Sequence, residues 1–144
     1  MAQPAFRGDR LLAAREAAGL SREELTLQLG LSSPYRIRQW EMGFERPQPR
    51  FVPPLAAALK TDPLHLLDVD PADPPLAALR VAAGLSIAHV GTPTMSLMTF
   101  QRLEDGRPGA EPSAAVVAAM SEVLGLDPER IEAAIRRSRS DRVY

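Results

Sequence analysis

The sequence predicts an all-α protein built from two copies of one small helical module. The first observation is a repeat: Gly19-Leu20-Ser21 returns as Gly84-Leu85-Ser86, and Asp62-Pro63 returns as Asp127-Pro128, both at a spacing of about 65 residues. The second is that apolar residues recur three and four positions apart, while no segment alternates in the manner of a strand. The third is that glycines and prolines divide the chain into short helices.

The repeat predicts two domains, residues 1–70 and residues 71–144, which we call the first half and the second half. Residues 68–75 between them are acidic and rich in proline, so they should form a short, stiff connection. Modules of this size bury only a thin core. We therefore expect the two halves to pack against each other or against a second chain.

The first half should begin with a helix over residues 9–18, which Gly19 ends. Ser21 and Glu24 then form a capping box that starts a second helix, because each side chain can accept a hydrogen bond from the other residue's backbone amide. Gly30 ends this second helix.

A third helix is predicted over residues 34–42, where Ser33 caps the start and Pro34 occupies the first position, which needs no amide hydrogen. Ile37 and Trp40 lie three apart and should face the core. A fourth helix follows, and its inner face carries Phe51, Leu55 and Leu59. A fifth begins at Asp62-Pro63.

The second half repeats this plan, with helices expected near residues 76–83, 86–90, 96–105, 113–124 and 127–135. Its second helix should be short, because Gly91 and Pro93 interrupt it and His89 replaces the glutamate of the capping box. The residues after Ile135 form a basic tail that we expect to be mobile. That tail contains Arg136, Arg137, Arg139 and Arg142.

Composition excludes several classes of protein. A net charge of −1 argues against a uniformly basic coat for nucleic acid, although a local excess of arginine lies between Ser33 and Arg50. No apolar run reaches the roughly 20 residues that span a bilayer, and residues 1–6 do not resemble a secretory signal. The chain has no cysteine, which fits a reducing cytoplasm. We therefore expect a cytoplasmic protein without a membrane partner.

Catalytic and metal-binding motifs are not apparent. His65 and His89 lie in different halves, and neither has a second histidine or a cysteine at ligand spacing. No ordered nucleophile motif or glycine-rich phosphate loop is present. The sequence predicts that the protein is not an enzyme and holds no metal or cofactor.

Three motifs follow one another along residues 8–67: Gly19-Leu20-Ser21-Arg22-Glu23-Glu24-Leu25, then Ile37-x-x-Trp40-Glu41-x-Gly43, then Pro49-Arg50-Phe51-Val52-Pro53. In this order and at these distances they resemble the Cro/C1-type (XRE) helix-turn-helix transcriptional regulators, and the last motif is similar to the lambdoid phage repressors. The resemblance implies two tandem five-helix domains of the lambda-repressor type. It also implies a bacterial or phage protein that binds double-stranded DNA and lies on the nucleoid when bound.

An α-helix fits the major groove of DNA, and a helix-turn-helix places its second helix there. In the first half this recognition helix is residues 34–42. With two of its side chains facing the core, its outward positions hold the candidate base-reading residues Tyr35, Arg36, Arg38 and Gln39. Arginine can bind guanine and glutamine can bind adenine. One alternative stays open for Tyr35, which could instead pack against its own domain.

The resemblance also assigns residues around the recognition helix. Arg22 falls where family members bind a phosphate, and Arg46 and Arg50 lie in a loop that follows the DNA backbone. These arginines could also be merely a solvated face. The resemblance further implies two structural ion pairs, Arg15 with Glu41 in the first half and Arg80 with Glu104 in the second.

The corresponding helix of the second half would present Leu97 and Met98, which suit a protein contact better than base edges. Either these two residues form an interaction surface or the helix is rotated and they are core. We expect the first half to read DNA as a repressor and the second half to form a homodimer. Two alternatives stay open. Both halves could bind another protein, as an antitoxin or a regulatory adaptor does, or both could read DNA as an intramolecular pseudo-dimer.

Overall fold

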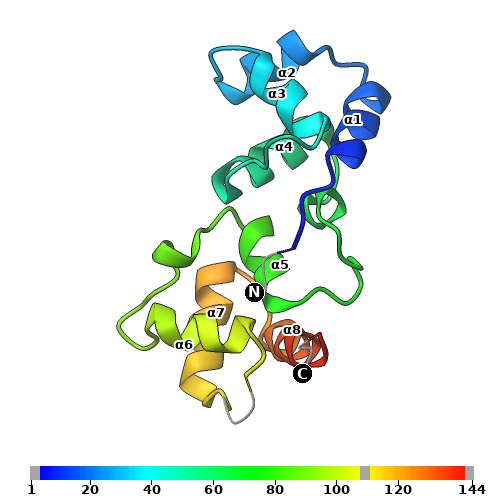
Figure 1. The fold of residues 1–144 in the computed structure, drawn as a ribbon. Helices are drawn as coiled ribbons and strands as arrows, with labels where there is room; N and C mark the ends of the chain where they lie inside the picture. The colour runs from blue at the N-terminus through cyan, green and yellow to red at the C-terminus, as the bar shows by residue number, and fades with distance from the viewer. Residues whose placement is uncertain (1–3, 108–110, 142–144) are drawn as a thin grey trace.

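The computed structural model describes residues 4–107 and 111–141 (Figure 1). Within these ranges the chain forms eight α-helices and three short 3-10 helices, and the only β pairing is an isolated antiparallel bridge between Phe6 and Leu67. The prediction of an all-α protein is therefore confirmed. Figure 1 shows the helices between residues 8 and 59 gathered in one lobe and the helices between residues 76 and 140 in the other.

The first half contains α1 (Gly8–Ala17), α2 (Arg22–Leu29), α3 (Tyr35–Glu41), η1 (Pro49–Phe51), α4 (Val52–Leu59) and η2 (Pro63–Leu66). The second half contains α5 (Leu76–Ala82), η3 (Ile87–His89), α6 (Leu97–Glu104), α7 (Ala114–Leu124) and α8 (Pro128–Ser140). Two predicted α-helices are 3-10 helices instead, the one that follows Asp62 and the one that follows Ser86. Five α-helices were expected in each half. Within the described residues each half has four, so this expectation was wrong.

The start of α2 follows the predicted capping box. Ser21 Oγ accepts the Glu24 amide at 3.0 Å, and Glu24 Oε1 accepts the Ser21 amide at 2.9 Å. In the second half, Ser86 Oγ lies 2.5 Å from His89 Nδ1 and caps no backbone amide. The first box supports an eight-residue α-helix, whereas the second segment is a three-residue 3-10 helix.

Replacing Ser21 by alanine should therefore cost about 1 kcal/mol of unfolding free energy, because the Glu24 amide loses its partner. Urea unfolding followed by circular dichroism measures this loss. Ser86→Ala is the matched control, and it should change stability by less than about 0.5 kcal/mol because no cap is lost. Equal losses in the two variants would contradict this account of α2.

The C-terminal region differs from the prediction. α8 continues through Ser140, whereas a mobile tail was expected after Ile135. Ser138 is buried. Its hydroxyl oxygen accepts a hydrogen bond from the Leu76 amide at 2.9 Å, and its O–H group donates one to the Ala134 carbonyl at 3.0 Å. The polar residue thus ties α8 to the start of α5, and this contact explains the extra helical length. Arg142 lies outside the described residues.

Two arginines of that region form ion pairs, which the prediction of a mobile tail did not include. Arg137 pairs with Asp73 at 3.3 Å and with Asp141 at 3.1 Å, and Arg139 pairs with Glu111 at 3.1 Å. Arg136 is exposed. The expected basic tail is therefore partly neutralised where the structure describes it.

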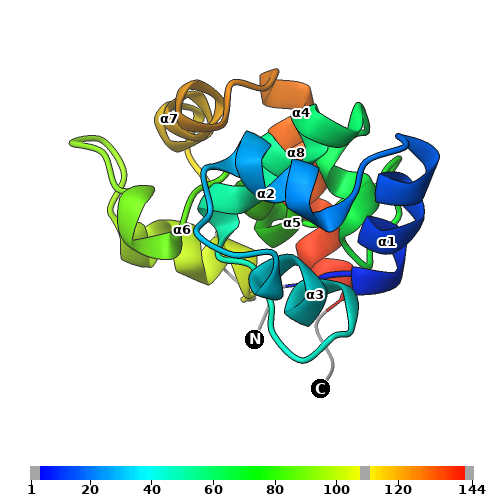
Figure 2. The same ribbon diagram turned by 90° about the horizontal axis from the view of Figure 1, so that it is seen from above.

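The two halves pack against each other through apolar residues. The first half has a core around Trp40 and Leu55. The core of the second half, around Phe100, also takes in Val52, Leu64 and Leu67 from the first half. The expectation that the two halves pack together is confirmed. α2 and α3 lie at the end of the molecule opposite α8 (Figure 1), and α3 lies at its outer edge when the molecule is seen from above (Figure 2).

Candidate nucleic-acid interface

α2 and α3 are joined by a short turn. α2 ends at Gly30, whose φ of 69° is a left-handed conformation, and Ser33 Oγ accepts the Tyr35 amide at 3.1 Å. Pro34 lies just before α3 rather than in it, so the predicted helix began one residue too early. Ile37 and Trp40 are 0% and 2% exposed. Their burial in the core sets the rotation of α3 about its axis.

The outer face of α3 is open to solvent. Tyr35 is 58% exposed, Arg36 and Arg38 are exposed, and Gln39 is half-buried. The second half does not cover these side chains, because they keep this exposure in the presence of every other residue of the chain. The alternative in which Tyr35 packs against its own domain is wrong. Of the four predicted base-reading residues, Tyr35, Arg38 and Gln39 thus lie on one accessible side of α3.

Arg36 is oriented differently from the prediction. Its guanidinium carbon lies 5.3 Å from the centre of the Phe51 ring and 5.7 Å from that of Trp40. Arg50, next to Phe51 in η1, lies 4.8 Å from the same ring. Arg36 is therefore turned toward η1, and Arg46 and Arg50 are exposed in the segment after α3.

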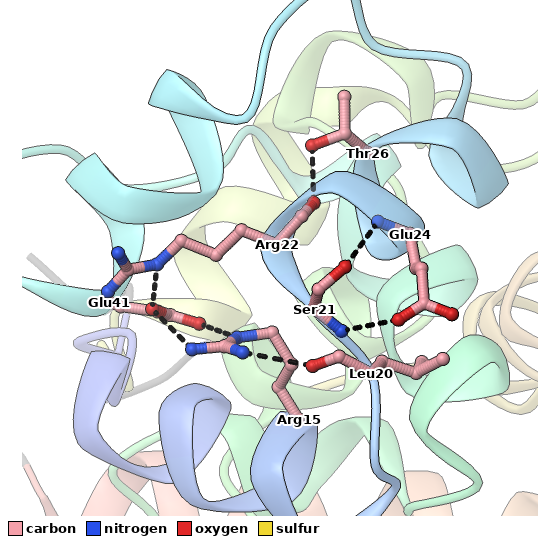
Figure 3. Close-up of polar contacts among 7 residues, drawn as sticks. All are labelled: Arg15, Leu20, Ser21, Arg22, Glu24, Thr26 and Glu41. Carbon is pink, nitrogen blue, oxygen red and sulfur yellow. Dashed lines mark hydrogen bonds and ion pairs between the residues drawn. The ribbon is translucent and has the colours of Figure 1, made fainter.

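A buried carboxylate connects α1, α2 and α3 (Figure 3). The Glu41 side chain is 0% exposed and accepts Arg15 Nε at 2.5 Å and Arg22 Nε at 2.8 Å. Arg15 also donates to the Leu20 carbonyl at 2.9 Å. The hydrogen bond to Glu41 raises the pKa of Arg15 above its ordinary value. The family resemblance predicted that Arg15 pairs with Glu41 but not that Arg22 joins them.

The second half contains a similar pair with one partner fewer. Arg80 and Glu104 are both buried and joined by a short ion pair, and Arg80 Nη1 donates to the Leu85 carbonyl at 2.9 Å. In the repeat, Ile87 stands where the first half has Arg22. Burial raises the pKa of Glu104, while the hydrogen bond from Arg80 opposes this shift.

On α6, Leu97 is 40% exposed and Met98 is 56% exposed. The alternative that a rotated α6 buries both of them in the core is therefore wrong. Beside them, Gln101 and Arg102 are also exposed. The described part of the second half thus offers a mixed apolar and polar helix face.

The described residues contain neither a metal-binding cluster nor a helix that could span a membrane. No group of three or more histidine, aspartate or glutamate side chains in the described ranges could hold a metal ion. None of the described helices is both long enough and apolar enough to cross a membrane.

Residues 76–134 match a family model described as a helix-turn-helix domain. No curated protein and no solved structure matches the chain. The matched residues run from α5 into α8 and include the Arg80–Glu104 pair. The described residues are thus helical, and the second half is similar to a helix-turn-helix domain.

Proposed function

We propose that this protein is a sequence-specific double-stranded DNA-binding regulator that reads the major groove with α3. The observation that carries the proposal is the outer face of α3, where Tyr35, Arg38 and Gln39 are accessible while Ile37 and Trp40 fix the helix from behind. Arg38 can donate to a guanine and Gln39 can bind an adenine. Phosphate contacts from arginine would set the position of the helix on the duplex.

Arginines around α3 supply these phosphate contacts. Arg46 and Arg50 are exposed in the segment that follows α3. Arg22 donates its Nε to Glu41, which leaves its two terminal nitrogens for a phosphate (Figure 3). Phosphate neutralisation releases counterions, so affinity should fall steeply as salt rises. A net charge of −1 is compatible with this mode of binding because the arginines are clustered.

The second half provides either a second DNA-reading helix or the contact with a second copy of the chain. One recognition helix reads only a few base pairs, and dimeric helix-turn-helix proteins read half-sites about 34 Å apart. Exposed Leu97 and Met98 favour a homodimer through α6. In this arrangement the protein would act in the cytoplasm as a repressor that occupies a promoter. The helix-turn-helix match in the second half also supports the alternative of an intramolecular pseudo-dimer.

A second candidate function is a protein-interaction module, such as an antitoxin or a regulatory adaptor. The exposed apolar residues on α6 favour it. The two functions differ in their response to salt, because a contact centred on Leu97 and Met98 should change little where phosphate contacts weaken strongly.

Selection of duplexes from a random pool by the full chain tests the proposal. We expect an enriched motif, and Arg38→Ala should lose about 1–3 kcal/mol of discrimination at one base pair of that motif. Arg136→Ala is the control, since it removes an exposed arginine from α8 at the other end of the molecule. Absence of any enriched motif, or equal specificity of the two variants, would contradict the proposal.

A further inference from the structure

Two arginines from different elements each lie over the same aromatic ring. Arg36 comes from α3 and Arg50 from η1, and their guanidinium carbons lie 5.3 and 4.8 Å from the centre of the Phe51 ring. Phe51 in turn contacts Trp40 with ring centres 5.4 Å apart, so the buried tryptophan holds it in place. An aromatic face attracts a cation electrostatically, which favours these positions for both guanidinium groups.

The charges on these arginines are not neutralised. Neither Arg36 nor Arg50 forms an ion pair with a carboxylate in the described part of the chain, whereas Arg15 and Arg22 share the carboxylate of Glu41. The Phe51 ring positions both guanidinium groups, and they remain available to an anion supplied from outside the chain.

We propose that Arg36 and Arg50, positioned by the Phe51 ring, form an anion site for the phosphodiester backbone of one DNA strand beside α3. This site rests on the proposed function and changes the role of one residue in it. Arg36 becomes a phosphate ligand, and the base-reading face of α3 is reduced to Tyr35, Arg38 and Gln39. Guanidinium groups suit this role because they donate two parallel hydrogen bonds to phosphate oxygens.

The second half lacks every part of this site. Aligned on its buried glutamate, α6 carries Thr99 where α3 carries Arg36. Aligned on the left-handed residues that end α4 and α7, which are Lys60 and Gly125, the positions of Arg50 and Phe51 hold Ala115 and Val116. The anion site is therefore a property of the first half.

Salt titration of duplex binding by the full chain tests the site. The probe is the duplex selected by the wild-type protein, together with a set of its single-base-pair variants. Arg36→Ala should weaken binding to every duplex by the same factor, because a phosphate contact carries no sequence information. The slope of log affinity against log salt should fall by about 0.9, so the ratio of wild-type to variant affinity shrinks about 3.5-fold between about 50 and about 200 mM salt.

Substitutions of Phe51 test whether the ring positions the two arginines, because they leave the charges of both arginines unchanged. Phe51→Leu keeps both arginines and the Trp40 ring but removes the ring that Arg36 and Arg50 share, so its salt slope should fall by about 0.9 or more. Phe51→Tyr keeps the aromatic face and should bind with the wild-type slope, which also controls for folding of the core. An unchanged slope in Arg36→Ala would show that Arg36 contacts no phosphate, and a loss confined to one base pair would show that it reads a base. Either result would overturn the site.

A second probe does not depend on the proposed function. Inorganic phosphate is titrated into the full chain while the side-chain Nε–H signals of the arginines are followed by nuclear magnetic resonance. The Arg36 and Arg50 signals should shift together in the wild type and in Phe51→Tyr, but not in Phe51→Leu. If the wild type binds no duplex yet shows this pattern, the anion site stands and DNA binding fails. If these signals do not shift together, the site is overturned.

Discussion

Replacing Glu41 by alanine is expected to destabilise the protein by about 3–5 kcal/mol and to weaken duplex binding at the same time. The loss of stability follows because the carboxylate is fully buried and accepts hydrogen bonds from both Arg15 and Arg22. Without it, the charge of Arg15 remains in a largely buried position with no opposite charge. Thermal and urea unfolding measure the first effect, and duplex titration well below the melting temperature measures the second.

Two matched variants separate the effects of Glu41→Ala. Glu45→Ala removes an exposed carboxylate from the same region and should leave stability within about 0.5 kcal/mol of the wild type. Glu104→Ala removes the buried carboxylate of the second half, so it should destabilise that half while Arg22 keeps its partner, and it should weaken duplex binding less than Glu41→Ala does. Melting of Glu41→Ala at the wild-type temperature would refute the structural role of the pair.

The sequence was most informative where local chemistry determines structure. The capping box at Ser21 and Glu24 predicts the start of α2, and the interruption by Gly91 and Pro93 predicts that the corresponding helix of the second half is short. These features depend on residues a few positions apart, so a single sequence is enough to recognise them. The inward side of α3 could be predicted for the same reason, from the spacing of Ile37 and Trp40.

Features that depend on tertiary contacts were not predicted. α8 extends to Ser140 because Ser138 hydrogen-bonds the start of α5, and a serine in a polar stretch gives no sign of that partner. Arg22 reaches Glu41 only because α2 crosses beside the end of α3. Arg36 turns toward Phe51 because η1 brings that ring next to α3. Each contact joins elements far apart in the sequence, where periodicity and capping carry no information.

The two halves share one ion pair but differ in the arginines around it. In each half an arginine pairs with a buried glutamate. The same arginine also donates to the backbone carbonyl of the residue five positions further along the chain. This pair joins α1 to α3 in the first half and α5 to α6 in the second. Only the first half adds Arg22, Arg36 and Arg50 around it. The pair therefore fits a role in the fold, whereas the added arginines fit the proposed DNA contact.

The close packing of α1 against α3 leads to a prediction that opposes helix propensity. Gly8 lies in the first turn of α1, and alanine in a helix is ordinarily up to about 1 kcal/mol more stable than glycine. An added Cβ at Gly8 would, however, collide with the carbonyl oxygen of Trp40 and lie 2.8 Å from that of Glu41. Both are backbone atoms of α3, so they cannot move aside as a flexible side chain would.

Gly8→Ala is therefore expected to destabilise the protein by about 3 kcal/mol, the upper end of the usual cost of overpacking. It should also weaken duplex binding, because relief of the collision shifts α3 relative to α1 and displaces the face that holds Tyr35 and Arg38. Gly19→Ala is the control: its added Cβ meets nothing within 4 Å, and its φ of 70° costs only about 1–2 kcal/mol. Urea unfolding ranks the two variants. A Gly8→Ala protein more stable than the wild type would show that propensity outweighs packing, and that α1 does not hold α3 at this distance.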